Sequence, residues 1–291
     1  MKIGNSNGTF WYIEEPAAIF TRMKELGYDV ADWNIADTQK EIYHDDAAME
    51  AYCKAIKEGA AAAGIEMWQA HGPWPTDDKT PESREIGWGY FHRAVYMCHL
   101  AGCPRLVIHP QMPYGYGVET EPELPKELTV GLIRDLLPDC EKYGVTICLE
   151  NMPFRGHRIS TMNRIVEAVA EVNSPYAAIC MDTGHVNVFE NYDLGDAVRQ
   201  CAPYLQSFHI HDNDGKRDSH ELPWWGTANW DGFVEALAEI DYKYPLILEC
   251  SGNFPGNVPW PVRDAAEKLT AATARTLAEM VENKKTANKG V

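Results

Sequence analysis

The chain has 291 residues, 45% of them hydrophobic and 24% charged, which is typical of a globular protein with one large core. A formal net charge of −17 disfavours nucleic acid as a partner, because an acidic surface repels phosphate and gains nothing from counterion release. The sequence contains no apolar run of about 18 residues, so we expect no membrane span.

Cysteine usage indicates a compartment. The eight cysteines form no C-x-x-C pair, and several lie inside apolar runs. The first residues, MKIGNSNGTFWYIEE, lack the basic start and apolar stretch of a signal peptide. We therefore predict reduced, mostly buried thiols and a cytoplasmic location.

Strand-like and helix-like segments alternate along the chain. The first predicted helix begins at Pro16 and ends at Gly27, and later ones end at Gly102 and Gly144. Each glycine is followed at once by an apolar strand, as in right-handed βαβ units. The predicted strands are residues 1–4, 29–35, 65–71, 105–110, 145–151, 177–183, 206–212 and 245–250.

Eight strand–helix units in series predict an α/β protein with a single (β/α)8 TIM barrel, a fold that typically takes about 250 residues. An open dinucleotide-binding sheet is disfavoured, because GNSNGTFWY after the first strand does not match G-x-G-x-x-G. We predict one domain over residues 1–291, with 282–291 as a frayed polar tail.

Metal-ligating residue types stand where the later strands end. In a TIM barrel these C-terminal strand ends meet at one mouth, where active sites are built. Three converging carboxylates without Lys or Arg partners on the strands would repel one another unless a cation lay between them. We therefore predict one divalent ion. Its ligands are Glu150, Asp182, His211 and Glu249.

The other histidines leave alternatives open. His209 points the same way as His211 but two residues deeper, so we assign it to a supporting position behind the ligands. His71 and His109 end strands of their own and are either hydrogen-bonded core histidines or further ligands. The loop residues His185, Asp218 and His220 are possible additional metal or substrate ligands, or merely solvated.

Tryptophans near the predicted mouth indicate a carbohydrate ligand. Trp74 follows a strand end and Trp225 lies in the loop after the seventh strand, and their flat apolar faces suit the C–H face of a sugar ring. A subunit interface would explain them equally well, so we also expect a homo-oligomer, a dimer or a tetramer.

The strings LEN, DTGH, HIHDNDGKRDSH, GTANWDGF and LEC, in this order, resemble the xylose-isomerase-like TIM-barrel superfamily. The resemblance implies Mn²⁺ at the four predicted ligands, with Mg²⁺, Co²⁺ or Zn²⁺ as alternatives. It implies substrate contacts from His185 and Arg217. We predict in addition that Glu150 and Glu249 transfer the proton, one removing it and the other returning one. The sequence equally matches the trinuclear zinc ligands of the family 2 apurinic endonucleases: His71, His109, Glu150, Asp182, His185, His211, Asp218, His220 and Glu249.

The chain also departs from both branches. Gly156 stands where ketose 3-epimerases carry a second Glu, and LENMPFRG differs from the LENTAG-like string of the endonucleases. We predict a metal-dependent isomerase or epimerase that removes a proton next to the carbonyl of a sugar or cyclic polyol. The alternatives are a lyase or dehydratase with the same site, a trinuclear-zinc phosphodiesterase and a sugar-binding barrel without activity.

Overall fold

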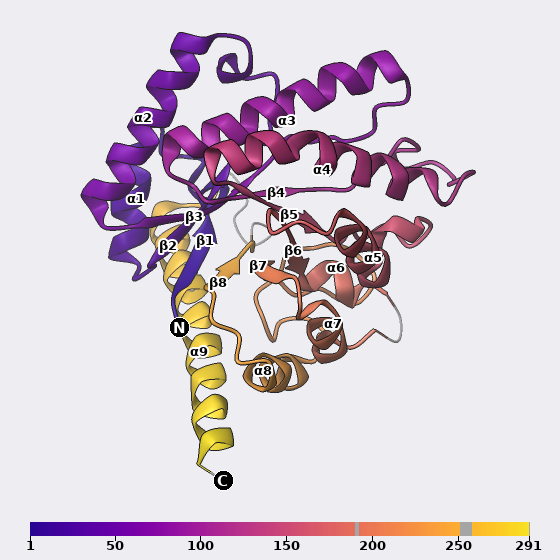
Figure 1. The fold of residues 1–291 in the computed structure, drawn as a ribbon. Coiled ribbons are helices and arrows are strands. Elements are labelled where there is room, and N and C mark those ends of the chain that lie inside the picture. The colour runs from indigo at the N-terminus through magenta and orange to yellow at the C-terminus, as the bar shows by residue number, and fades with distance from the viewer. Residues whose placement is uncertain (190–191, 251–257, 291) are drawn as a thin grey trace.

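The strands form one parallel sheet that curls into a barrel. A computed structural model of the protein describes residues 1–189, 192–250 and 258–290. The eight strands follow the order β7-β6-β5-β4-β3-β2-β1-β8. They surround the centre of the molecule in Figure 1. Their bounds are β1 Ile3–Ser6, β2 Val30–Asn34, β3 Glu66–His71, β4 Arg105–Ile108, β5 Thr146–Glu150, β6 Ala177–Asp182, β7 Leu205–His209 and β8 Leu246–Leu248.

The barrel closes where β8 returns to β7. Ile210 and Leu248 form an isolated parallel bridge there, with hydrogen bonds from Ile210 N to Ile247 O at 2.8 Å and from Glu249 N to Ile210 O at 3.0 Å. Every predicted strand is present, so the prediction of a single (β/α)8 barrel is confirmed.

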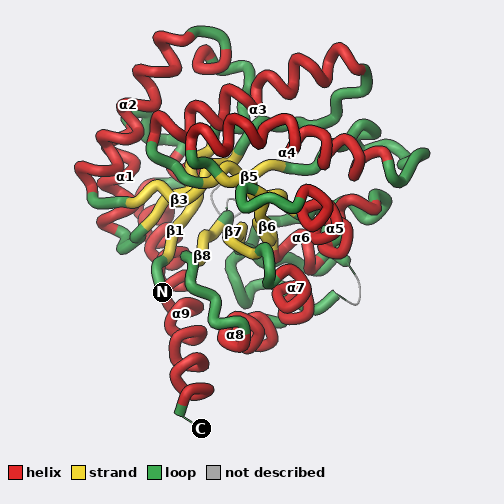
Figure 2. The backbone as a smooth tube through the Cα atoms, viewed as in Figure 1, coloured by secondary structure: helices red, strands yellow, loops and turns green. Residues whose placement is uncertain are grey.

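Helices cover the outside of the sheet, and loops join them to the strands (Figure 2). In the described part of the chain the α-helices are α1 Pro16–Glu25, α2 Asp46–Ala63, α3 Pro81–Ala101, α4 Leu124–Tyr143, α5 Met162–Val172, α6 Thr183–Asn187, α7 Leu194–Cys201, α8 Trp230–Glu239 and α9 Trp260–Lys289. None of these helices is long and apolar enough to cross a membrane.

Local sequence explains where the helices begin and end. Pro16 begins α1, and Gly102 and Gly144 end α3 and α4 in the left-handed conformation, with φ of 74° and 70°. That conformation is costly for other residues. Thr80 and Ser83 form a capping box at the start of α3. Short 3-10 turns η1 Asn7–Phe10, η2 Glu41–Tyr43 and η3 Arg158–Ser160 complete the connections.

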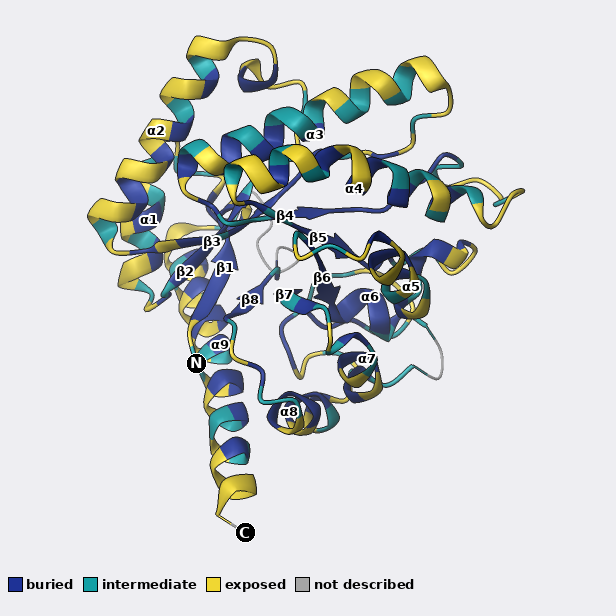
Figure 3. Ribbon diagram, viewed as in Figure 1, coloured by how far each residue is buried: buried dark blue, intermediate teal, exposed yellow. Residues whose placement is uncertain are grey.

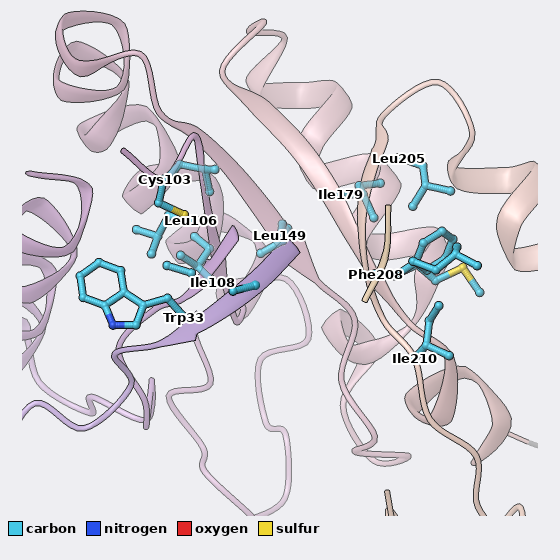
Figure 4. Packing of buried hydrophobic residues seen from close by; sticks show 14 of the residues in the cluster. Trp33, Cys103, Leu106, Ile108, Leu149, Ile179, Leu205, Phe208 and Ile210 are labelled. Atoms are coloured by element: carbon cyan, nitrogen blue, oxygen red, sulfur yellow. The ribbon is translucent and has the colours of Figure 1, made fainter. Parts of the chain in front are cut away.

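Successive side chains along each strand point alternately to the helices outside the sheet and to the inside of the barrel, so the protein has two separate cores. Outward side chains such as Leu149, Ile179 and Phe208 pack with the helices in the main core, shown in Figure 4. Their neighbours Cys148 and Cys180 form a small cluster with Val107 and Ala178. These alternate with the helix-packed residues and therefore point into the barrel. Helix faces that meet the strands are buried, and their outer faces are exposed (Figure 3).

The C-terminal segment differs from its prediction. Residues 282–289 continue helix α9 instead of fraying, because Lys285 is buried, donates to the carbonyl of Tyr242 and pairs with Glu282 at 3.2 Å. Apolar residues Leu277 and Val281 anchor the same helix to the core. Val291 lies outside the described residues.

Candidate metal centre

A pocket of about 370 Å³ opens at the C-terminal ends of the strands. Its lining includes these residues singled out from the sequence: His71, Trp74, His109, Glu150, His185, Asp218, His220 and Glu249. The other two predicted ligands, Asp182 and His211, are fully buried beneath it. The structure therefore brings the strand-end residues together at one mouth, as the barrel topology requires.

Glu150, at the end of β5, is central to the site. Its Oε1 accepts a hydrogen bond from His209 Nδ1 at 2.9 Å. Its Oε2 lies 3.2 Å from His109 Nε2, but no hydrogen bond forms, so this buried oxygen is unsatisfied among the described residues. Burial alone would raise the pKa of Glu150, yet His209 and His109 hold that pKa well below its usual range. Glu150 is therefore a buried anion whose Oε2 is paired with His109 but accepts no hydrogen bond from the described residues.

His209 is fully buried, as its deeper position on the strand predicts, and it contacts three carboxylates. Its Nδ1 is 3.4 Å from Glu249 Oε2, and its Nε2 is 3.2 Å from Asp32 Oδ2 on β2. Asp32 is fully buried, and neither of its oxygens has a hydrogen-bond partner in the described chain. One imidazole thus stands between three carboxylates and neutralises part of their charge. Sequence reasoning missed Asp32, although its inward position on a strand was a usable signal.

Asp182 connects two groups of ligands. Its Oδ2 accepts from His211 Nε2 at 3.0 Å, and its Oδ1 accepts the backbone N–H of His185 at 2.6 Å as the N-cap of α6. The groups whose ligand atoms lie within 4.8 Å of one another include Glu150, Asp182, His209 and Glu249. His211 belongs instead to the group described next. Three of the four predicted ligands therefore lie in one group with His209, whereas His211 contacts that group through Asp182. The role of His211 as a ligand stays a prediction.

The second group lies beside the first and includes the loop residues. Its members are His185, His211, Asp218 and His220. Asp218 Oδ2 is 3.2 Å from His185 Nε2 and 3.3 Å from His220 Nε2. The rings of His211 and His220 stack with centroids 3.9 Å apart. These residues therefore contact one another at the mouth and are only partly exposed, while their role as ligands stays a prediction.

Carboxylates control the charge of this second group. Burial would lower the pKa of His185, but Asp182, Asp218 and Glu150 raise it to about 10. Burial likewise opposes the charge on His220, and Asp218 and Glu249 raise its pKa to about 9. In return the two histidines hold the pKa of Asp218 far below its usual range despite burial. Without a metal ion, both imidazoles therefore carry a proton at neutral pH.

A third group consists of His71, His109 and Glu150. The rings of His71 and His109 meet edge to face at 4.8 Å, and Trp74 meets His109 in the same way at 4.6 Å. Burial lowers the pKa of His109, which favours the neutral imidazole that a metal needs. Both histidines are thus close enough to Glu150 to serve as ligands, the second of the two readings left open by the sequence.

Two predicted substrate residues lie elsewhere. The Arg217 side chain is 80% exposed and pairs with Asp214 at 3.0 Å. Trp225 is 58% exposed and lies outside the described pocket lining. Their roles in substrate binding stay predictions. Aromatic residues that sequence reasoning missed, Tyr116 and Phe154, line the pocket with rings 5.2 Å apart.

The residues fit a divalent cation. Imidazole nitrogens and carboxylate oxygens are ligands that Mn²⁺, Co²⁺ and Zn²⁺ accept. The unsatisfied Glu150 Oε2 and both Asp32 oxygens are buried acceptors of the kind that a cation or a proton donor would satisfy. The histidines supply part of the counter-charge, so the strand-end carboxylates demand a cation less strictly than the sequence alone indicated.

The fold and the site define a (β/α)8 barrel with metal-ligating side chains gathered at its C-terminal mouth. The model of the xylose isomerase-like TIM barrel family matches residues 20–279, and the chain belongs to this family.

Relatives of this chain fall into both branches considered above. A D-psicose 3-epimerase of Ruminiclostridium cellulolyticum is 26% identical over 248 residues, which are 82% of this chain and 77% of the epimerase. A probable endonuclease 4 of Mycoplasma mobile is 26% identical over 220 residues, 68% of this chain and 72% of that protein. The crystal structure of a D-psicose 3-epimerase in the presence of D-fructose superimposes with a TM-score of 0.77 at 21% identity, covering 95% of this chain and 99% of that chain.

Proposed function

We propose that the protein is a metal-dependent sugar isomerase or epimerase. The observation that carries this proposal is that Glu150 and Glu249 both line the pocket and both contact one buried imidazole, that of His209. Two carboxylates on one pocket can take a proton from a carbon and return one to it or to its neighbour. The similarity to D-psicose 3-epimerases supports the same reaction class.

Residues of this chain would supply both the metal ligands and the groups that transfer the proton. Glu150, Asp182 and Glu249 would hold the ion with a histidine, and either His209 or His211 is within reach of Asp182. When bound, a divalent ion polarises a carbonyl and acidifies the adjacent C–H bond. Glu150 or Glu249 would accept that proton, and the other would return one. Manganese is the ion we expect.

The pocket suits a neutral sugar. Its described lining contains no Lys or Arg, which a phosphorylated substrate would need as a partner. Trp74, Tyr116 and Phe154 also line it and offer apolar faces to C–H groups. We therefore propose an unphosphorylated ketose, keto-sugar or inosose. With a hydroxyl as leaving group on the next carbon, the same site would act as a lyase or dehydratase.

A specific observation also favours a second function. Three groups of possible ligands share Glu150 or lie beside it, and together they include all nine positions that match the trinuclear zinc ligands. The similarity to probable endonuclease 4 proteins agrees with this arrangement. A phosphodiesterase would retain three zinc ions per chain after gel filtration, whereas the isomerase requires one exchangeable ion. Metal analysis of the purified protein, with cleavage of an abasic oligonucleotide, separates them.

The decisive test of the proposed function is exchange with solvent. Metal-reconstituted protein is incubated in D₂O with ketoses, inososes and 3-keto sugars, and NMR follows deuterium incorporation and new isomers. Deuterium at a carbon next to the carbonyl, dependent on metal and absent with Glu150→Gln, is the expected result. If no sugar exchanges while the protein holds its metal, the proposal fails.

We also propose a homo-oligomer. Trp11, Trp225 and Trp260 are more than half exposed, which is unusual for tryptophan on a monomer's surface. Sedimentation of the purified protein tests this, and a monomer at micromolar concentration would contradict it.

A further inference from the structure

Thr183, the residue after Asp182, holds the backbone of His211. Its hydroxyl donates to His211 O at 2.7 Å and accepts from His211 N at 2.9 Å. The regular pairing of β6 with β7 ends one step earlier, at Asp182 and His209. A side chain therefore satisfies both backbone groups of His211 where no strand is left to do so.

Asn151, the residue after Glu150, holds the backbone of Asp182 in the same way. Its Nδ2 donates to Asp182 O at 3.0 Å, and its Oδ1 accepts from Asp182 N at 2.8 Å. Pairing of β5 with β6 ends at Glu150 and Cys180, so the carboxamide acts as one further rung of the ladder. The carbonyl of Asn151 also accepts from His185 Nδ1 at 2.7 Å.

Asp212, the residue after His211, holds the loop that follows β7. Its fully buried carboxylate accepts N–H groups from residues 213, 224, 226 and 228 and the indole N–H of Trp230, at 2.8–3.1 Å. Backbone pairing of Asp212 with Glu221 adds two more bonds across this loop. The loop carries Asp218 and His220 and is thus fixed at its base.

These three contacts follow one rule. In each case the residue after a predicted metal ligand uses its side chain to hydrogen-bond the backbone of the next segment of chain. Asn151 joins β5 to β6, Thr183 joins β6 to β7, and Asp212 joins β7 to its loop; we call each such contact a clasp. The loop then reaches the last strand, because His220 Nδ1 donates to the carbonyl of Glu249 at 2.7 Å. A continuous series of side-chain clasps therefore runs around half of the barrel mouth.

We propose that Asn151, Thr183 and Asp212 are positioning residues that set the spacing of the metal ligands before an ion arrives. The need for them is physical. The buried or partly buried carboxylates of Glu150, Asp182, Asp218 and Glu249 share this mouth. The histidines neutralise only part of their charge, and the repulsion that is left acts to spread the strand ends apart in the metal-free protein. Asn151 and Thr183 resist that movement through neutral groups, and both Asp212 oxygens are already occupied by N–H donors, so none of the three competes for the ion. The inference rests on the proposed metal site.

The test measures metal affinity rather than turnover. Thr183→Val keeps the shape of the side chain and removes both hydrogen bonds, and Thr183→Ser keeps the hydroxyl. For the metal-free protein titrated with Mn²⁺, with free ion read by electron paramagnetic resonance, the valine variant should bind about 10–100-fold more weakly, as is typical for loss of a supporting hydrogen bond. The serine variant should bind close to wild type.

A matched control removes an equivalent pair of threonine hydrogen bonds away from the metal site. Thr129 is also fully buried and also both accepts and donates, from Gln111 N at 2.8 Å and to Pro125 O at 2.7 Å. Thr129→Val should lower the melting temperature like Thr183→Val but leave the Mn²⁺ affinity unchanged.

Three outcomes would overturn the proposal. Wild-type affinity in Thr183→Val would show that the clasp serves only stability, and equal weakening in Thr129→Val would show a general effect of destabilisation. If Thr183→Val does not fold, Asp212→Asn makes the same test, and wild-type affinity there overturns it. A wild type that binds Mn²⁺ without turning over sugar would instead refute the proposed function and leave this inference standing.

Discussion

Gly184 lies against the imidazole ring of His211, so closely that no side chain fits between them. A Cβ at position 184 would be 1.9 Å from His211 Cε1 and 2.2 Å from its Nδ1. Both residues are buried, and the ring is bonded to Asp182 on one nitrogen and stacked on His220, so it cannot move away freely. This explains the glycine of the DTGH string: its lack of a side chain makes room for His211, which we predict to be a metal ligand.

Gly184→Ala should therefore displace the His211 ring and weaken metal binding. We expect Mn²⁺ or Zn²⁺ affinity to fall at least about tenfold, the lower end of the range for disturbed metal sites. Gly89→Ala is the matched control, because Gly89 is also helical and a Cβ there meets nothing within 4 Å. That control should bind metal as wild type does. Equal affinities in the two variants, measured by isothermal titration, would show that His211 is no ligand.

Glu150→Gln should nearly abolish turnover. The buried Glu150 carboxylate accepts from His209 and is the proposed proton carrier, and general acid–base groups contribute about 10²–10⁴-fold to rate. Glu249→Gln should behave similarly, whereas Asp214→Asn, on the exposed side of the loop, should keep most activity. Steady-state kinetics on the sugar found by exchange, with metal content measured for each variant, checks this. A fully metal-loaded Glu150→Gln with normal kcat would contradict it.

Metal affinity should rise with pH in a way that identifies the ligands. The pKa values of His185 and His220, raised to about 10 and about 9, mean that both rings are protonated in the metal-free protein at neutral pH. An ion on these rings must displace their protons, so affinity should increase up to about tenfold per pH unit for each proton released, and level off above these pKa values.

Calorimetry in two buffers of different ionisation enthalpy counts the released protons. His220→Asn should remove one of them if an ion occupies the group of His185, Asp218 and His220. It should change nothing if the single ion lies at Glu150 and Glu249. An affinity that is flat between neutral pH and the raised pKa values would show that neither ring is a ligand.

The sequence was sufficient for the fold because the fold depends on repeating local patterns. Eight apolar runs became eight strands, and the glycines that end α3 and α4 have the positive φ that their positions required. Strand ends also identified the mouth correctly, since topology alone brings Glu150, Asp182 and Glu249 together. These statements need only the order of residues and the period of a strand.

The direction in which individual side chains point could not be predicted from the sequence. His209 and His211 are two residues apart and therefore point to the same side of the strand, so the sequence does not distinguish them. Which of the two rings lies close to Glu150 depends on ring positions at the ångström scale. Arg217 turns to Asp214 because that neighbour caps the same turn, a local competition that motif position does not reveal. The loop residues Tyr116 and Phe154 reach the pocket through irregular backbone, for which no periodic signal exists.

The cysteines provide a test that is independent of metal. All eight are free and buried, as the sequence predicted, and burial raises the pKa of the Cys98, Cys148 and Cys180 thiols. Because the thiolate is the reactive form, the folded protein should react with fewer than one equivalent of a disulfide reagent over minutes, and with eight after unfolding in guanidinium. Absorbance of the released thiolate measures both values. Rapid labelling of the native chain would show that the barrel opens on this timescale. The hydrogen bonds of Asn151, Thr183 and Asp212 would then not keep the mouth rigid.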